Sequence, residues 1–152
     1  MALKVLLATT CRWFATARVA MAFSNVGCEV DIVSPANHPA CLTRAIQNRY
    51  RYHGLTPLRF FQAAILSSRP DIVIPCDDVA MRHLHRIYAA ASQTRSPSSN
   101  AICHALQASL GDPASYPITE SRDKFMALVR EEGIRIPETK TVTSADEVEH
   151  WV

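Results

Sequence analysis

Glycine is scarce in this sequence, and its first predicted strand–turn–helix segment has none. Four glycines occur in 152 residues, and the earliest is Gly27. Residues 4–23 nevertheless run from apolar strand to polar turn to helix, an order typical of the opening of nucleotide-binding α/β domains. A dinucleotide site needs glycines in that turn, so that the backbone can approach a pyrophosphate. Their absence disfavours a dehydrogenase-type site and leaves open what the turn binds.

An excess of one charge is also lacking, as are long apolar runs. The chain has 16 basic and 14 acidic residues and a formal net charge of +2. This balance predicts no binding to nucleic acid or to a membrane surface. No run approaches the roughly 18 apolar residues of a membrane span. The first apolar run is too short for an export signal, and Arg12 and Arg18 interrupt the segment that follows it. We expect a cytoplasmic protein.

Paired cysteines are lacking too. The five cysteines are an odd number without a C-x-x-C pair, which predicts free thiols in a reducing compartment. No cysteine or histidine pair has the spacing of zinc ligands. His83 and His85 lie two residues apart and would face different directions on a helix. No metal site is predicted.

The sequence does contain an alternation of short apolar runs and helical patterns. The predicted strands are residues 5–8, the segment CEVDIVSP at residues 28–35, which Pro35 closes, and residues 72–75. Helices are predicted between and after them, the first with Thr16 as its N-cap and Gly27 as its stop. Right-handed β-α-β crossovers make such strands parallel. The predicted fold is therefore α/β, a three-layer sandwich with a mainly parallel, Rossmann-like sheet. Residues 36–54 show no clear period and are predicted as loop and short helix, and residues 93–100 as a polar linker.

The chain is predicted to divide near Pro117, into a first domain of residues 1–117 and a second part of residues 118–152. The second part starts a pattern that it does not complete, because its last predicted helix breaks off at Trp151 and Val152. An apolar pair inside the first turns of a helix is unusual at the end of a closed domain. We expect the chain to be a fragment of a longer protein.

Polar side chains follow the first and the last of the three predicted strands. They are Thr9, Thr10, Cys11 and Arg12 after the first, and Cys76, Asp77 and Asp78 after the last. Ligands of open parallel sheets bind where the carboxyl ends of strands diverge, so these groups are candidates for binding a small polar ligand. Alternatively, one of the two aspartates caps the following helix and leaves the other free. The two cysteines then serve as small residues at the core edge, and the adjacent carboxylates raise the pKa of Cys76.

A second candidate is Lys124, near the start of a helix predicted from Glu120 or Ser121 to Gly133. The backbone N–H groups of a helix start and a lysine can share an anion such as phosphate. Alternatively, Lys124 is a solvated surface residue.

The segment from Ser121 to Val152 resembles the entry segment of the ATP-grasp superfamily. In that pattern an Asp-Lys pair opens a helix, and a Gly-Ile, a Pro-x-Thr and an acidic helix start follow. The chain has matching residues in that order: Asp123, Lys124, Met126, Gly133, Ile134, Pro137, Glu138 and Thr139. Residues 70–84, PDIVIPCDDVAMRHL, are similar to a later strand of the Rossmann-like pre-ATP-grasp domain. The resemblance covers nearly the whole chain.

The resemblance implies the substrate-side domain of an ATP-dependent carboxylate–amine or carboxylate–thiol ligase, plus the first elements of its ATP-binding lobe. Such ligases activate a carboxylate as an acylphosphate, and ATP and Mg²⁺ are their cofactors. Lys124 matches the family lysine that reaches the ATP phosphates. A second lysine and the magnesium ligands would lie beyond Val152, so the chain alone is expected to be inactive and to hold no cofactor.

The resemblance also implies that the pre-domain helps to hold the acceptor substrate. Thr9, Thr10 and Arg12 suit a small carboxylate-bearing molecule, facing Cys76 and the two aspartates. The remaining ATP-grasp lobes are the expected partners, and exposed sheet edges leave a homo-oligomer open. Two rival hypotheses remain. One is a non-catalytic Rossmann-like domain that binds a small molecule, and the other is a receiver-type signalling domain, although a receiver more usually has an acidic pair after its first strand.

Overall fold

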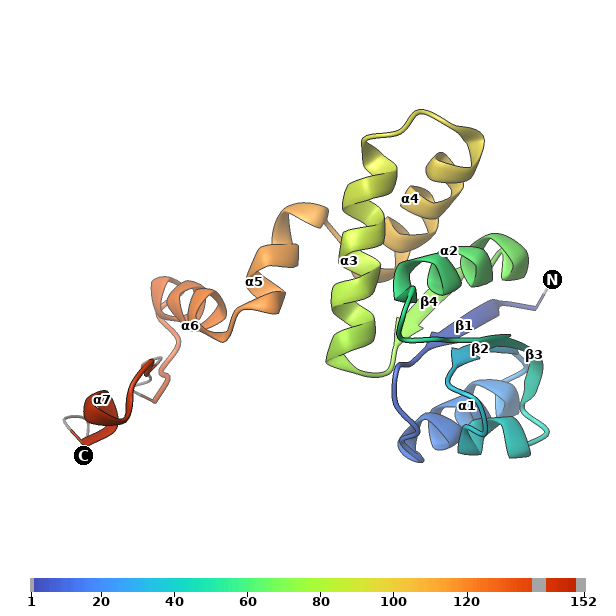
Figure 1. Cartoon of the computed structure of the whole chain (residues 1–152), viewed down its shortest axis with the longest axis horizontal. Helices are drawn as coiled ribbons and strands as arrows, with labels where there is room; N and C mark the ends of the chain where they lie inside the picture. The colour runs from blue at the N-terminus through green and yellow to red at the C-terminus, as the bar shows by residue number, and fades with distance from the viewer. Residues whose placement is uncertain (1, 138–141, 150–152) are drawn as a thin grey trace. The chain divides into compact units, whose positions relative to one another are not determined.

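The computed structural model describes residues 2–137 and 142–149, and the chain forms two compact units, Met1–Pro113 and Ala114–Val152 (Figure 1). The elements of the first unit, in chain order, are β1 (Lys4–Ala8), α1 (Ala15–Asn25), β2 (Glu29–Ser34), the 3₁₀ helix η1 (Pro39–Leu42), β3 (Ile46–Arg51), α2 (Pro57–Ser68), β4 (Ile72–Pro75), α3 (Asp78–Ser92) and α4 (Pro97–Leu110). No helix among the described residues is both long enough and apolar enough to cross a membrane.

The four strands of the first unit form one wholly parallel sheet in the order β3-β2-β1-β4. α1 and η1 pack on one face of this sheet, whereas α2, α3 and α4 cover the other. This arrangement confirms the predicted α/β three-layer sandwich. The chain builds outward from β1 to the edge strand β3 and then returns through α2 to β4 on the other side of β1.

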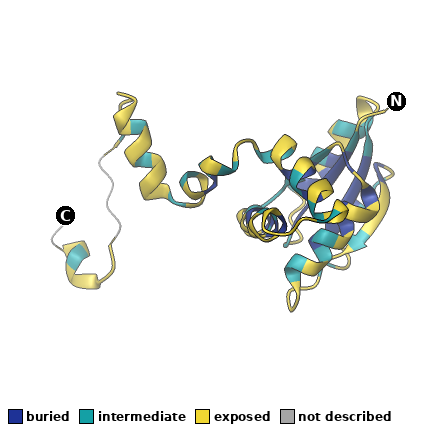
Figure 2. Cartoon of the chain, turned by 90° about the horizontal axis from the view of Figure 1, so that it is seen from above, coloured by how far each residue is buried: buried dark blue, intermediate teal, exposed yellow. Residues whose placement is uncertain are grey.

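The first strand is a continuous apolar run because helices cover both of its faces. Val5 and Leu7 are buried in the cluster with α1, and Leu6 and Ala8 are buried in the cluster with α2, α3 and α4. Figure 2 shows the same pattern, with the strands of the sheet coloured as buried and the outer faces of the helices as exposed. Both clusters therefore fix the position of β1 and of the turn that follows it.

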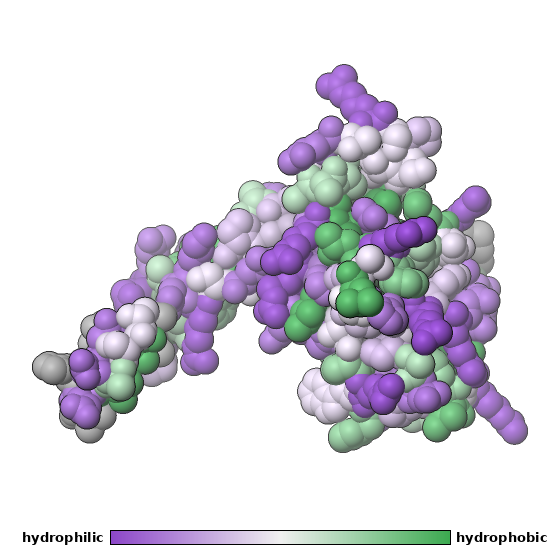
Figure 3. Space-filling view, in the orientation of Figure 1, coloured by the Kyte–Doolittle hydropathy of each residue, from purple (hydrophilic) through white to green (hydrophobic). Residues whose placement is uncertain are grey.

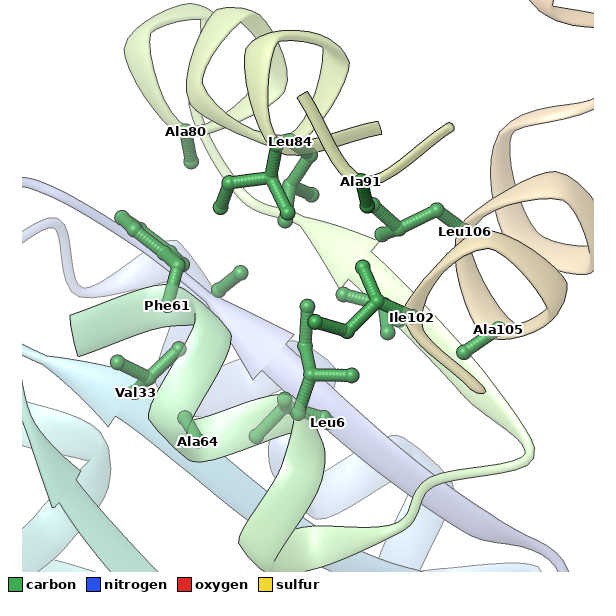
Figure 4. Packing of buried hydrophobic residues seen from close by; sticks show 14 residues of the cluster. Leu6, Val33, Phe61, Ala64, Ala80, Leu84, Ala91, Ile102, Ala105 and Leu106 are labelled. Carbon is green, nitrogen blue, oxygen red and sulfur yellow. The ribbon is translucent and has the colours of Figure 1, made fainter. Parts of the chain in front are cut away.

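The larger cluster is built where three helices meet over the sheet. Phe61 of α2, Leu84 of α3 and Leu106 of α4 are fully buried there, and their side chains converge above Leu6 of β1 (Figure 4). Fully burying a side chain of this size stabilises a fold by about 1.5–3 kcal/mol. This packing anchors the start of α3 next to the end of β4.

Strand β3 corrects the prediction of loop and short helix for residues 36–54. Only η1 and the turns that flank it fit that prediction, and residues 46–51 form the edge strand. A bulge explains why the strand had no clear period: Val30 pairs with Ile46, but Ile32 pairs with Arg49. An extra residue of this kind interrupts the alternation of side chains.

Two helix starts also differ from the predictions. Phe14 occupies the N-cap position of α1 without a side-chain hydrogen bond, and Thr16 is buried inside the helix. The predicted linker is shorter than expected, because Ser96 caps α4 by accepting a hydrogen bond from the backbone N–H of Ser99 at 3.1 Å. Pro97 suits the first position of α4, where its missing N–H costs nothing. Gly27 follows α1 with φ of 85°, which confirms the predicted stop.

The second unit contains short helices. They are α5 (Tyr116–Glu120), α6 (Arg122–Glu131) and α7 (Ala145–Glu149), and the 3₁₀ helix η2 (Pro113–Ser115) spans the division. Ser121 caps α6, as predicted, by accepting a hydrogen bond from the N–H of Lys124 at 3.3 Å. Parts of the predicted extended segment and of the last predicted helix, at residues 138–141 and 150–152, lie outside the described residues.

Candidate functional site

The carboxyl ends of β1 and β4 meet at one rim of the sheet. The two strands pair in parallel, and the N–H of Cys76 continues the ladder by donating to the carbonyl oxygen of Ala8 at 2.8 Å. The connections after β1 and β4 leave on opposite faces of the sheet, toward α1 and α3. This is the topological switch point at which open α/β sheets bind ligands. The prediction that both polar stretches lie on the same rim is confirmed.

The carboxylate of Asp77 closes this part of the rim. Its Oδ2 accepts hydrogen bonds from the N–H of Thr10 at 2.6 Å and from the hydroxyl of Thr9 at 2.9 Å. Its Oδ1 accepts from the hydroxyl of Thr10 and from the N–H of Ala80, both at 2.8 Å. Asp77 therefore caps α3, as one of the two predicted alternatives required, and at the same time ties α3 to the turn after β1.

These hydrogen bonds set the charge state of Asp77. Burial alone raises the pKa of a carboxyl group, but the donors on Thr9, Thr10 and Ala80 outweigh burial and hold the pKa of Asp77 below its usual value. The carboxylate is thus ionised at neutral pH and saturated with donors from the protein itself. Asp78, the next residue, is exposed in the first turn of α3.

The polar groups of the turn are used internally as a result. Thr9 is fully buried, and its hydroxyl also lies 3.0 Å from the carbonyl oxygen of Cys11. A hydroxyl donates one hydrogen bond at a time, so Thr9 shares its proton between Cys11 and Asp77. Thr9, Thr10 and Asp77 thus brace the rim, and their predicted role in binding a substrate stays a prediction.

The two cysteines of the rim differ in environment. Cys11 is exposed, and its Sγ lies 3.8 Å from Oδ2 of Asp77. Burial, with a smaller contribution from Asp77, raises the pKa of Cys76 to about 11 despite the nearby hydroxyl of Thr16. Cys76 is therefore a protonated thiol at neutral pH and not a nucleophile. The prediction that the adjacent carboxylate raises its pKa is confirmed, although burial is the larger cause.

Arg12 links the switch point to the neighbouring part of the rim. Its Nε donates a hydrogen bond to the carbonyl oxygen of Ala36 at 2.8 Å, across to the loop that follows β2. The residue is exposed, so its terminal guanidinium nitrogens face solvent. In the same loop His38 is fully buried. Burial and the charge of Arg12 lower the pKa of His38, which keeps the imidazole neutral at neutral pH.

A pocket of about 370 Å³ opens between the β2–β3 connection and the edge strand. We call it the arginine pocket, after the two guanidinium groups at its wall. Its lining residues are Ser34, Pro35, Ala36, Asn37, His38, Cys41, Leu42, Arg49, Tyr50 and Arg51. The sequence-based site missed this pocket because strand β3 was not predicted. One feature of the sequence could have revealed the strand. Basic and aromatic residues alternate in QNRYRY, residues 47–52, as in a strand whose two faces have different surroundings.

A second pocket, of about 610 Å³, lies between α2 and α4, beside the residues that lead into the amino end of β4. Its wall is mostly apolar, with Arg69 and His104 at its edge.

On the face of the molecule that Figure 3 shows, hydrophilic and hydrophobic residues are interspersed.

Lys124 belongs to the second unit, away in sequence from the rim residues. It lies in the first turn of α6 and is exposed, as the alternative of a solvated surface residue also requires. Within the described parts of the chain, no three histidine, cysteine, aspartate or glutamate side chains gather in the way that metal ligands do.

Comparison with known protein families and with curated proteins gives no match to this chain.

Proposed function

We propose that the first unit is the substrate-side domain of an ATP-grasp, ATP-dependent carboxylate–amine or carboxylate–thiol ligase. In this proposal it binds a small carboxylate-bearing molecule at the carboxyl ends of its strands. Two features support the proposal: the Rossmann-like three-layer fold, and the ordered resemblance of residues 70–84 and 121–152 to that superfamily.

The observation that carries the proposal is the way in which Asp77 occupies the turn after β1. A dinucleotide-binding turn offers free backbone N–H groups to a pyrophosphate. Here the N–H of Thr10 already donates to Asp77 at 2.6 Å, and the carboxylate repels a second anion at the same place. This arrangement argues against a nucleotide bound at the first turn and favours a protein whose nucleotide is bound elsewhere, as in the ATP-grasp superfamily.

Within this proposal the rim residues have different roles. Asp77, Thr9 and Thr10 position the turn, and Arg12 contacts the substrate. The guanidinium of Arg12 is held by one hydrogen bond from Nε to Ala36, which orients the remaining N–H groups without using them. Such a planar fork suits a carboxylate.

ATP and Mg²⁺ are proposed to be bound by lobes encoded after this chain, with Lys124 as one phosphate contact. ATP would supply the phosphoryl group that activates the carboxylate. A single exposed charge contact contributes about 0–1 kcal/mol, whereas micromolar affinity requires roughly 8 kcal/mol. We therefore expect residues 1–152 alone to bind ATP no more tightly than millimolar.

The test is an activity assay on the protein encoded by the whole open reading frame. We expect phosphate release from ATP that depends on an added small carboxylate and an amine or thiol acceptor. In the whole protein the ATP-binding lobes would enclose this contact, and a hydrogen bond to a charged group is then worth about 1.5–3 kcal/mol, so the Lys124→Ala variant should lose at least about tenfold in kcat/KM for ATP. Arg130→Ala, at the other end of α6, is the matched control and should change it by less than about twofold. An absence of carboxylate-dependent turnover, or equal activity of both variants and the wild type, would contradict the proposal.

The second candidate is a non-catalytic domain that binds a small anion. The arginine pocket favours it, because that pocket lies entirely within the first unit. The two candidates differ in one result: a non-catalytic domain binds its ligand with equal affinity whether or not ATP is present and turns nothing over. The cytoplasmic location expected from the sequence stays a prediction under both.

A further inference from the structure

The arginine pocket contains two cations that the protein does not neutralise. Arg49 pairs with Ile32 and Arg51 with Ser34 in the β2–β3 ladder, so both arginines stand on the same face of the edge strand. Both are exposed, and the side chain of neither has a hydrogen bond or an ion pair with any other described residue. The two guanidinium groups are therefore free to bind a ligand.

No acidic side chain offsets these cations at the pocket wall. None of the ten residues that line it is acidic. Asp31, a buried carboxylate on the neighbouring strand, accepts hydrogen bonds from Ser68 of α2 and from Asn48, and lies 3.5 Å from Nζ of Lys4. It is thus committed to groups on the α2 side of the sheet. The pocket combines uncompensated positive charge with a concave shape, which favours anions.

His38 provides a second, independent observation at the pocket wall, because one of its ring nitrogens has no hydrogen-bond acceptor. The side chain is fully buried and lines the pocket. Its Nδ1 accepts a hydrogen bond from the N–H of Ala40 at 3.1 Å, so the proton of the neutral ring is on Nε2. That Nε2 is buried and has no partner among the described residues. Buried donors in native proteins are nearly always satisfied, so this nitrogen indicates an acceptor that the described residues do not provide.

The size and the apolar part of the wall limit the ligand further. A volume of about 370 Å³ is at the small end of the range for metabolite pockets. Pro35 and Leu42 form an apolar part of the wall, and Leu42 is 89% exposed. The pocket therefore fits a compact anion with a short carbon skeleton better than a nucleotide.

We propose that the arginine pocket binds the oxyanion of a small metabolite, a carboxylate or a phosphate, with Arg49 and Arg51 as its charged partners. Arg12 lies at the margin of the pocket, because its Nε is bonded to Ala36 of the wall. The statement that the bound molecule is a ligase substrate rests on the proposed function. The binding of an oxyanion here does not.

The test is a calorimetric titration of residues 1–152 with inorganic phosphate and, separately, with succinate at low ionic strength. We expect saturable millimolar binding of at least one of them, and the tighter probe identifies the chemistry of the natural ligand. The double variant Arg49→Gln/Arg51→Gln should weaken binding by about tenfold or more, as expected for the loss of charge-assisted hydrogen bonds. Arg44→Gln is the matched control, since Arg44 is exposed on the same connection but does not line the pocket. It should change the affinity by less than about twofold.

A measurement on the unaltered chain supports the variants. In an NMR titration with the same probe, the ¹⁵Nε2 and ¹Hε2 signals of His38 should shift along with binding. The inference is overturned if neither probe binds, if the double variant binds as tightly as the wild type, or if the His38 signals do not move. If binding depends on Arg12 and not on Arg49 and Arg51, the pocket is excluded and the proposed function survives. If binding occurs in the pocket but the whole protein lacks ATP-dependent activity, the proposed function fails and this inference stands.

Discussion

The two halves of the sheet rim use charge in opposite ways. At the ends of β1 and β4, the carboxylate of Asp77 is saturated by four protein donors. At the ends of β2 and β3, the guanidinium groups of Arg49 and Arg51 have no partner among the described residues, and a buried nitrogen of His38 lacks an acceptor. We call the part of the rim at β1 and β4 the closed half, because its charged group is already bonded, and the part at β2 and β3 the open half. The closed half resembles a structural brace, and the open half resembles a binding surface. Polar residues at a switch point are therefore weak evidence for a ligand until their own hydrogen bonds have been traced.

The largest effect should come from breaking the closed half. Asp77→Ala removes the cap of α3 and leaves the buried donors of Thr9 and Thr10 without an acceptor. We expect a loss of about 3 kcal/mol in the free energy of unfolding, measured by urea denaturation. Asp78→Ala, one residue further along an exposed helix start, is the control and should cost less than about 0.5 kcal/mol. Equal effects of the two substitutions would remove the distinction between brace and surface.

The closed half should also protect its buried thiol. A thiol with a pKa of about 11, as for Cys76, is ionised to only about one part in a thousand at pH 8, and the thiolate is the reactive form. We expect iodoacetamide to modify Cys76 at least about a hundredfold more slowly than the exposed Cys11. Mass spectrometry of the alkylated peptides measures both rates in one sample. Comparable rates would mean that the rim opens more readily than its hydrogen bonds suggest.

The pH dependence of stability sharpens the comparison further. The pKa of Asp77 is lower in the folded chain than its ordinary value near 4. Its contribution to stability is therefore fully present above the unfolded pKa and is lost as the pH falls through the folded pKa. The stability difference between the wild type and Asp77→Asn should be constant from about pH 5 to 7 and should shrink below about pH 4. Urea melts across this range measure it, and a difference that grows on acidification would contradict the account.

The smallest effect should come from the open half. Arg49→Gln and Arg51→Gln remove no hydrogen bond or ion pair with another described residue. We expect changes in unfolding free energy within about 0.5 kcal/mol, together with the weakened anion binding that the pocket predicts. A loss above about 2 kcal/mol for either substitution would show that these arginines are structural.

The sequence predicted most of the closed half, because local rules determine it. Apolar runs covered on both faces identified β1 and β4, and the right-handed crossover rule placed their ends on one rim. It could not show that Asp77 bonds to Thr9 and Thr10, since those donors lie more than 60 residues away and depend on the registry of the two strands. The alternative of a helix cap was correct for the same carboxylate, so one side chain has both roles.

The open half was missed for a different physical reason. A bulge sets three residue steps of β3, from Ile46 to Arg49, against two steps of β2, from Val30 to Ile32, and this removes the period that predicts a strand. Without the strand, the two arginines could not be placed on a common face. Thr16 shows the converse error: a residue type that favours N-caps is buried one position inside α1, and Phe14 occupies the N-cap position.

Residue-resolved NMR with inorganic pyrophosphate tests the central claim most directly, namely that the closed half braces the fold and the open half binds anions. Pyrophosphate is the group that a dinucleotide-binding turn would hold. Titrated into ¹⁵N-labelled residues 1–152, it should shift the Nε signals of Arg49 and Arg51 and the backbone amides of Ala36 and His38. The amide of Thr10, bonded to Asp77 at 2.6 Å, should stay in place. Saturable micromolar binding that moves the Thr10 amide first, and leaves the arginine signals unchanged, would contradict the account.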